Sequence, residues 1–318
     1  MEAAALEFTD ESPATTRLRD EVIAGLSRNP KALSPKLFYD ADGSRLFDAI
    51  CRTPEYYPTR TEMAILEERA EEIAALVGRG ALLIEPGSGS SDKVRLLLDA
   101  LRPATYMPMD ISRDHLYAAA RRLAGAYPWL SVHAACADFT LNETLPLCPS
   151  GMRRVVFFPG STIGNFEPEQ AVGFLRHIAD LIGADGGLLI GVDLKKDAAV
   201  LNRAYNDAAG ITAAFNRNLL YRMRRELGAA VDIERFEHSA FYNPTAGRVE
   251  MHLRSTVRQS IQVDGYRFVF EKGETLHTEN SYKYSVDGFT ALAGRGGLRS
   301  VQVWCDEDDL FSVHYLTH

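Results

Sequence analysis

Short apolar runs alternate with amphipathic segments over the first two thirds of the chain. Strands are expected at 81–85, 105–110, 130–139, 155–161 and 187–194, and helices at about 60–78, 92–102 and 168–182 and after Ser112. Strands that alternate with helices in this way form a parallel sheet that is covered on both faces. The pattern therefore predicts an α/β domain with a Rossmann-like sheet.

The periodicity changes after Leu194. Two helices are expected at 197–208 and 211–227, and apolar residues then recur at every second position from Val249 to Leu253. A period of two is typical of antiparallel strands with one exposed face. After this stretch, a helix and two strands are expected at 286–294, 298–304 and 310–316, and they look like the closing part of the first sheet.

This order predicts two domains. Residues 61–195 and 286–318 form the Rossmann-like domain, and residues 16–60 and 196–285 form an α+β domain made from an N-terminal segment and an insertion. Residues 1–15 are expected to be disordered.

Composition and charge narrow the possible partners. The chain has 318 residues, 46% of them apolar, and a net charge of −8, which disfavours binding to nucleic acid or to an anionic membrane. No signal peptide is visible, and no apolar run approaches the ~20 residues of a membrane span. The four cysteines are scattered, and the eight histidines lack the HxxxH pairing of a metal site. We expect a cytoplasmic monomer that holds no metal.

A glycine-rich turn, IEPGSGSSDK at 84–93, follows the first strand of the α/β domain. Glycine lets the backbone approach a ligand, and Asp110 ends the next strand, where an acidic residue binds ribose hydroxyls in Rossmann-like folds. Asp138 and Phe139 end the third strand and suit the edge and face of an adenine. Asp92 replaces the third glycine of a dinucleotide site, so S-adenosylmethionine, which has no phosphate, fits better. The other interpretation is that the glycines form only a tight turn.

Aromatic residues gather before the first domain: Phe38, Tyr39, Phe47, Tyr56 and Tyr57. Aromatic residues most often form structural clusters. A wall of aromatic rings also suits a quaternary ammonium product, through cation–π attraction. Composition leaves both interpretations open.

Five motifs, in order, make the sequence resemble the L-histidine Nα-methyltransferases of ergothioneine biosynthesis. They are PKLFYDADGSRLFDAICRTPEYYPTRTE, IEPGSGSSDK, FFPGSTIGNF, RAYNDAAGITAAFNRN and LHTENSYKYS. The resemblance runs from about residue 16 to the C-terminus, with Pro86 replacing a leucine that is common in the family. It implies a Rossmann-like domain joined to a second domain that supplies most of the amino-acid pocket. It also implies methylation of the α-amino group of L-histidine by S-adenosylmethionine, in three transfers that give hercynine.

The resemblance further implies roles for individual positions. S-adenosylmethionine would be held by Gly87, Lys93, Asp110, Asp138 and Phe139, with Tyr39 near its reactive end and the substrate amine. The histidine carboxylate would be held by Asn165 and Tyr205, and the imidazole by Tyr56, Glu279 and Ser281, with Met251 as a wall. Taken singly, Asn165 could cap a helix, Tyr205 could be a packing residue, and Glu279 could be a solvated loop residue.

Three alternatives remain. The chain could methylate another small amino acid or amine, although Glu279 favours a substrate with a ring N–H. A NAD-dependent dehydrogenase is disfavoured by the missing third glycine. A module that binds S-adenosylmethionine without turnover is disfavoured because the amino-acid motifs are complete.

Overall fold

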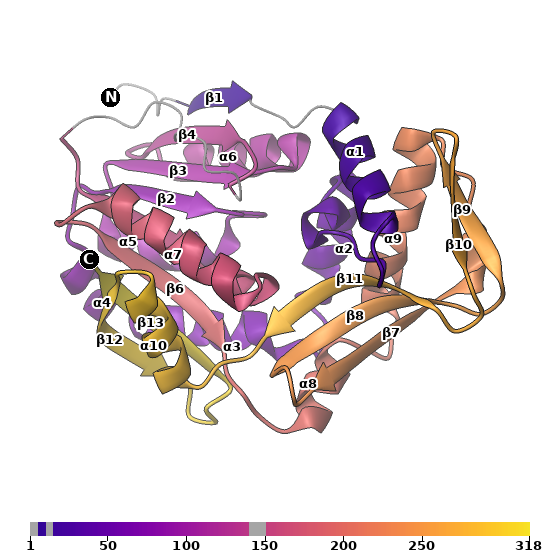
Figure 1. Ribbon diagram of the computed structural model, residues 1–318. Coiled ribbons are helices and arrows are strands. Elements are labelled where there is room, and N and C mark those ends of the chain that lie inside the picture. The colour runs from indigo at the N-terminus through magenta and orange to yellow at the C-terminus, as the bar shows by residue number, and fades with distance from the viewer. Residues whose placement is uncertain (1–5, 11–14, 140–150) are drawn as a thin grey trace. The chain divides into compact units, whose positions relative to one another are not determined.

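The computed structural model describes residues 6–10, 15–139 and 151–318, which fall into two compact units (Figure 1). Unit 1 comprises Met1–Ser12, Pro58–Lys195 and Lys283–His318, and unit 2 comprises Pro13–Tyr57 and Lys196–Tyr282. The sequence placed the corresponding boundaries at residues 61, 195 and 286.

Unit 1 is built around a sheet that has eight strands among the described residues, in the order β1-β4-β3-β2-β5-β6-β13-β12. The strands are β1 (Leu6–Asp10), β2 (Leu82–Pro86), β3 (Thr105–Asp110), β4 (Ser131–Cys136), β5 (Arg154–Phe158), β6 (Gly187–Asp193), β12 (Arg299–Cys305) and β13 (Phe311–Thr317). The strands from β1 to β6 in this order pair in parallel, whereas β13 and β12 are antiparallel. The order reverses between β2 and β5, and ligands of such sheets bind at the carboxyl ends of the strands beside this reversal.

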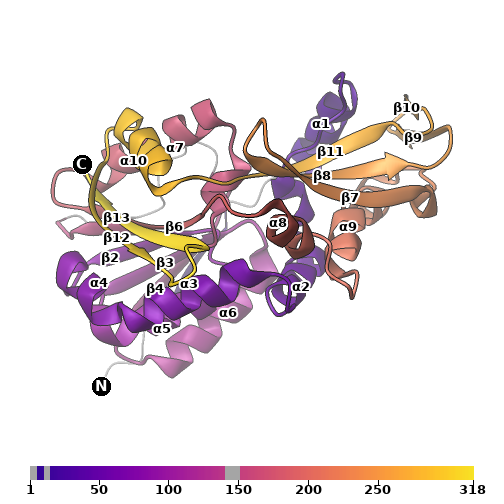
Figure 2. The ribbon, with the colours of Figure 1, turned by 90° about the horizontal axis from the view of Figure 1, so that it is seen from below.

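Helices cover both faces of this sheet (Figure 2). The helices of unit 1 are α3 (Tyr57–Glu68), α4 (Ala70–Val77), α5 (Asp92–Leu101), α6 (Arg113–Ala126), α7 (Pro168–Ile182) and α10 (Val286–Arg295). Side chains of α3 to α6 share one apolar core with the sheet, and side chains of α7 and α10 share the other. The predicted helix at 60–78 is interrupted at Arg69, where the backbone leaves the helical region with ψ 9°.

The first residues correct the expectation of a disordered segment at 1–15. Leu6–Asp10 form β1, which pairs with β4 at the edge of the sheet. The Phe8 ring packs edge-to-face on Tyr117 at 5.3 Å, and Arg113 Nε donates to Asp10 Oδ2 at 2.6 Å. Positions 1–5 and 11–14 lie outside the described residues, and Thr15 already begins helix α1. A five-residue strand is too short to show a period, and its partner is remote in sequence.

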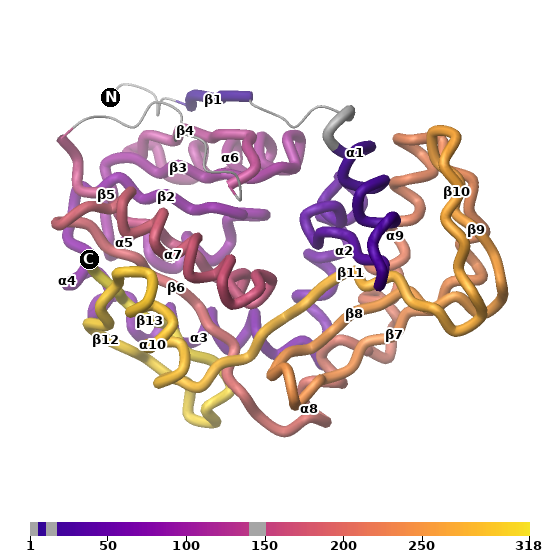
Figure 3. The backbone as a smooth tube through the Cα atoms, viewed as in Figure 1, coloured from indigo at the N-terminus to yellow at the C-terminus, as the bar shows by residue number. Residues whose placement is uncertain are grey.

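Unit 2 combines an antiparallel sheet with helices from both of its chain segments. The sheet has the order β11-β8-β7, with β7 (Phe236–Asn243), β8 (Arg248–Ser255) and β11 (Thr275–Tyr282), and β9 (Gln259–Val263) and β10 (Tyr266–Phe270) form a separate hairpin. The helices are α1 (Thr15–Leu26), α2 (Ala41–Ile50), α8 (Ala198–Ala204) and α9 (Ile211–Leu227). Along the chain, which Figure 3 colours from indigo to yellow, the strands of unit 2 follow β6 and precede α10 of unit 1.

The N-terminal segment belongs to this unit through backbone pairing. Leu33 N donates to His277 O at 2.9 Å, and His277 N donates to Lys31 O at 3.0 Å.

Across the described residues, no helix is long and apolar enough to cross a membrane.

Candidate active site

The glycine-rich turn follows β2, beside the reversal of strand order. Gly87 and Gly89 have φ values of +70° and +52°, which favour glycine. A Cβ at Gly87 would lie 3.3 Å from the Phe139 ring, whereas a Cβ at Gly89 would have no neighbour within 4 Å. Ser88 Oγ is buried and has no hydrogen-bond partner among the described residues. An open backbone and an unpaired hydroxyl fit a bound polar ligand.

Asp110 holds the turn from the end of β3. Its Oδ2 accepts from Gly89 N at 3.0 Å, and its Oδ1 accepts from Ser112 N at 2.8 Å. Burial raises the pKa of Asp110, and the bonds from backbone N–H groups oppose this rise. A carboxylate has about four acceptor positions, so Asp110 retains acceptor capacity for a ribose hydroxyl.

Asp138 and Phe139 lie just after β4, which ends at Cys136, and not within the strand as the sequence predicted. Asp138 is buried, and the Phe139 ring lies edge-on to Phe158 and Phe174 at 5.7 and 6.3 Å. The Phe139 ring therefore lies beside Gly87, and its role as the wall of an adenine site stays a prediction. Together with Asp110, these groups fit the nucleoside part of S-adenosylmethionine.

Lys93 is engaged by a residue that the sequence analysis missed. Its Nζ lies 2.5 Å from Glu62 Oε2, and Glu62, which is 0% exposed, also accepts from Gly160 N at 2.9 Å. The pair therefore ties α5 to the loop that follows β5. Glu62 lies three and four residues before Ile65 and Leu66, on the buried stripe of α3, and a carboxylate on such a stripe is the signal that could have identified it.

Glu85, at the end of β2, carries an unusual charge state. Burial raises the pKa of Glu85 to about 8, against the opposing effect of a hydrogen bond from Tyr106 Oη. Glu85 is therefore mostly protonated at neutral pH. The glycine-rich turn that follows β2 thus lies next to an uncharged carboxyl group.

The aromatic residues of the N-terminal segment meet the substrate-binding candidates inside unit 2. The rings form an edge-to-face series in which Tyr39 contacts Phe47 at 5.8 Å, Phe47 contacts Tyr56 at 6.3 Å, and Tyr56 contacts Tyr205 at 6.1 Å. Tyr205 Oη donates to Ser281 Oγ at 2.8 Å. We call Tyr39, Tyr56, Tyr205, Glu279 and Ser281 the tyrosine cluster.

Tyr56 keeps a protonated hydroxyl within this cluster. Burial raises the pKa of Tyr56 well above its ordinary value of 10, and the neighbouring Tyr205, Cys51, Glu279 and Tyr39 raise it further. Its hydroxyl is therefore protonated at any physiological pH, and Glu279 lies close enough to influence it electrostatically.

A β-bulge in β11 places Glu279 on the opposite face of the sheet from His277. The pairing with β8 shifts register between His277 and Glu279, and from there Glu279 lies opposite Met251. Residues two apart in a strand share a face, so Met251 and Ser281 flank Glu279. A bulge re-aims side chains in this way and cannot be recognised from strand periodicity alone.

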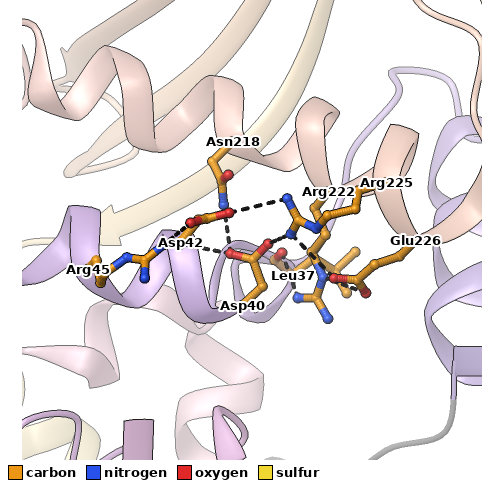
Figure 4. A network of polar contacts seen from close by, with 9 residues as sticks. Leu37, Asp40, Asp42, Arg45, Asn218, Arg222, Arg225 and Glu226 are labelled. Atoms are coloured by element: carbon orange, nitrogen blue, oxygen red, sulfur yellow. Dashed lines mark hydrogen bonds and ion pairs between the residues drawn. The ribbon is translucent and has the colours of Figure 1, made fainter. Parts of the chain in front are cut away.

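Tyr39 is held by the residue that follows it. Asp40 caps α2, and its Oδ1 accepts from Gly43 N at 2.7 Å and from Asn218 Nδ2 at 2.8 Å. Figure 4 shows that Arg225, from α9, also reaches the Asp40 carboxylate. These bonds fix the backbone at the start of α2 and with it the position of Tyr39.

Asn165 lies in unit 1, whereas Tyr205, its predicted partner on the histidine carboxylate, lies in unit 2. Asn165 ends the short 3-10 helix η2 (Thr162–Asn165), in the loop after β5. It does not cap α7, because Glu167 and Gln170 form the capping box of that helix. The structure thus removes the helix-cap interpretation of Asn165.

Two strands of unit 2 bring together a group that sequence spacing could not show. Glu250, His252 and His277 have possible metal-ligating atoms within 4.8 Å of one another. The two imidazole rings stack at 4.5 Å, and Glu250 Oε1 accepts from Arg248 Nε and Asn243 Nδ2 at 2.9 and 3.0 Å. Glu250 and His252 alternate with Met251 along β8 and so lie on the other face of the sheet. The absence of a metal stays a prediction.

Comparison with known proteins decides the family. Residues 18–318 match the sequence model of the family described as "Histidine-specific methyltransferase, SAM-dependent". The chain belongs to this family. The resemblance read from the five motifs and the Rossmann-like fold are confirmed, S-adenosylmethionine is the methyl donor of the family, and the dehydrogenase alternative is excluded.

Relatives with high identity cover nearly the whole chain. The chain is 45% identical over 299 residues to histidine N-alpha-methyltransferase of Mycolicibacterium smegmatis, which covers 92% of each chain. It is 42% identical over 302 residues to histidine N-alpha-methyltransferase of Mycobacterium tuberculosis, which covers 93% of each. A more distant relative is 4-dimethylallyltryptophan N-methyltransferase of Trichophyton verrucosum, 29% identical over 308 residues that cover 90% of this chain and 89% of the relative.

Proposed function

We propose that this protein transfers methyl groups from S-adenosylmethionine to the α-amino nitrogen of L-histidine. Three successive transfers would give hercynine, the betaine used for ergothioneine. The observation that carries the proposal is the tyrosine cluster, which supplies hydroxyls and a carboxylate from Glu279 on one sheet face. The identities of 45% and 42% to histidine N-alpha-methyltransferases support the same substrate.

The residues of unit 1 serve the methyl donor, which supplies a methyl group activated by a sulfonium. Asp110 binds the ribose hydroxyls, Asp138 and Phe139 bind the adenine, and Gly87 allows the close approach of the backbone. Lys93 forms an ion pair with Glu62. We therefore assign this pair to holding the glycine-rich turn and the loop at Gly160 in place for S-adenosylmethionine.

The residues of unit 2 serve the amino acid. Glu279 and Ser281 bind the imidazole nitrogens with Tyr56, Met251 forms a wall, and Tyr205 binds the carboxylate. Asn165, in unit 1, keeps the carboxylate role that the family resemblance implies. Tyr39 orients the amine. A neutral amine attacks a sulfonium methyl group without a strong base and loses its proton to water, so positioning supplies most of the acceleration.

Mass spectrometry of histidine incubated with S-adenosylmethionine and the protein tests the proposal. We expect S-adenosylhomocysteine together with mono-, di- and trimethylated histidine whose fragments place every methyl group on the α-nitrogen. The Asp110→Ala variant serves as the matched control with impaired donor binding. Absence of methylated histidine, or a product methylated only on the ring, would refute the proposal.

A second substrate class is kept because of the relative named 4-dimethylallyltryptophan N-methyltransferase. We expect histidine to win a competition against tryptophan and other amino acids, because imidazole has one nitrogen that donates to Glu279 and a second that accepts from a hydroxyl, whereas the indole N–H can only donate. A preference for tryptophan, or for an amino acid without a ring nitrogen, would establish the alternative. The cytoplasmic location and the monomeric state stay predictions.

A further inference from the structure

We propose that Asn216 and His238 are positioning residues that fix the spacing between the two ends of the amino-acid site, and thereby select substrates by the length of their side chain. The inference rests on the proposed function, because it takes Tyr205 as a carboxylate contact and Glu279 as an imidazole contact.

The observation is a chain of hydrogen bonds that begins at the backbone of Tyr205. Since a carbonyl only accepts, His238 Nε2 donates to Tyr205 O, at 2.9 Å. The other ring nitrogen of His238, Nδ1, then accepts from Asn216 Nδ2 at 2.9 Å. Burial lowers the pKa of His238, with Arg217 lowering and Asp207 raising it, so the neutral ring with one donor and one acceptor is favoured.

Asn216 continues the chain to the bulge. Its Oδ1 lies 2.8 Å from Thr278 Oγ1, and its second amide proton goes to His252 O at 3.0 Å. Asn216 is 0% exposed, so water cannot take the place of any of these hydrogen bonds if one is lost. Thr278 Oγ1 also lies 3.0 Å from Met251 O, across the strand pair. Thr278 is the extra residue of the bulge, immediately before Glu279.

The chain closes into a ring. From Thr278 the backbone leads through Glu279 to Ser281, and Ser281 Oγ accepts from Tyr205 Oη at 2.8 Å. The ring therefore contains the carboxylate contact Tyr205 and two of the three imidazole contacts, Glu279 and Ser281. Neither Asn216 nor His238 is needed to touch the substrate for this effect. A closed network of hydrogen bonds whose centre at Asn216 and Thr278 is buried resists a change in the distance between its members.

The consequence is a fixed length for the bound amino acid. In histidine, one methylene separates the α-carbon from the ring. A homologue with one more methylene, L-homohistidine, carries the same carboxylate, amine and imidazole but places the ring further away. With all of these hydrogen bonds in place, the site should reject L-homohistidine. When one of the hydrogen bonds is removed, the site should reject L-homohistidine less strongly.

The test compares Thr278→Val with Thr278→Ser. Valine matches the shape of threonine but removes the hydroxyl that pairs with Asn216, whereas serine retains it. The measurements are kcat and KM for L-histidine and L-homohistidine, the affinity for S-adenosylhomocysteine by calorimetry, and the melting temperature. A second pair opens the ring elsewhere: His238→Gln keeps a donor in the place of Nε2, and His238→Asn keeps an acceptor in the place of Nδ1.

We expect Thr278→Val to raise KM for histidine roughly 3- to 10-fold, as the loss of one buried hydrogen bond implies, with a smaller change in kcat. The ratio of kcat/KM for histidine to that for homohistidine should fall, S-adenosylhomocysteine affinity should be unchanged, and Thr278→Ser should resemble the wild type. If Thr278→Val does not fold, both His238 variants should show the same pattern.

An unchanged ratio between the two substrates, or equal losses in Thr278→Val and Thr278→Ser, would overturn the inference while leaving the proposed function intact. A wild-type protein that methylates neither substrate would instead overturn the proposed function.

Discussion

Replacing Glu85 with glutamine should make the protein more stable at neutral and alkaline pH. Glu85 is 1% exposed and lies beneath the cofactor turn. Burial raises the pKa of Glu85 from its ordinary 4.5 to about 8. Glutamine has nearly the same shape, carries no charge, and keeps an oxygen that accepts from Tyr106 Oη. The substitution therefore removes the titration and little else.

The sign follows from proton binding. Between pH 4.5 and 8, the folded chain holds a proton on Glu85 that the unfolded chain has released, so wild-type stability falls as pH rises through this window. The full benefit of the protonated group is present below the unfolded pKa and is lost as pH rises through the folded one. At pH 7 the loss amounts to about 3 kcal/mol.

Urea denaturation of the unliganded protein at pH 5, 6, 7, 7.5 and 8 measures this effect. We expect the difference in unfolding free energy between Glu85→Gln and wild type to grow by about 3 kcal/mol from pH 5 to pH 7.5 in favour of the variant. Glu307→Gln, at an exposed position, is the control and should follow the wild-type curve. Parallel curves for wild type and Glu85→Gln would show that the buried carboxyl is ionised in the folded protein, and the reasoning would fail.

Three further predictions address the two binding sites and the packing around Glu62. Asp110→Ala should weaken the binding of S-adenosylhomocysteine, measured by calorimetry, by at least about tenfold, since charge-assisted hydrogen bonds to ribose contribute roughly 1.5–3 kcal/mol each. An unchanged affinity would show that Asp110 does not bind the cofactor. Glu279→Ala should lower kcat/KM for histidine about 10- to 150-fold and affect an apolar aromatic amino acid much less, and equal proportional losses would assign it to the fold. Gly191→Ala should lower the free energy of unfolding by about 1–3 kcal/mol, because its Cβ would overlap the Glu62 carboxylate. An unchanged urea midpoint would contradict this packing.

Local patterns were enough for much of the α/β unit. The strands at β2, β3, β5 and β6 are apolar runs that the parallel sheet buries on both faces, and burial on both faces is what makes such runs visible in a sequence. The glycine turn, Asp110 and Asp138 could be placed because they follow strand ends, and the carboxyl ends of parallel strands meet at one edge. The motifs then indicated the family without any tertiary information.

Other features were decided only by contacts between residues far apart in the chain. β1 is stable because β4 completes its backbone bonds, and the buried position of Glu62 depends on Lys93 and on the loop after β5. The bulge before Glu279 depends on the pairing of β11 with β8. The hydrogen-bonded ring through Asn216 and His238 depends on the contact of α9 with the strands. A buried polar residue needs hydrogen-bond partners, but its sequence position does not say which residues these are. The partners are defined only when the fold brings distant segments together. The direction of the Glu279 side chain depends on such contacts.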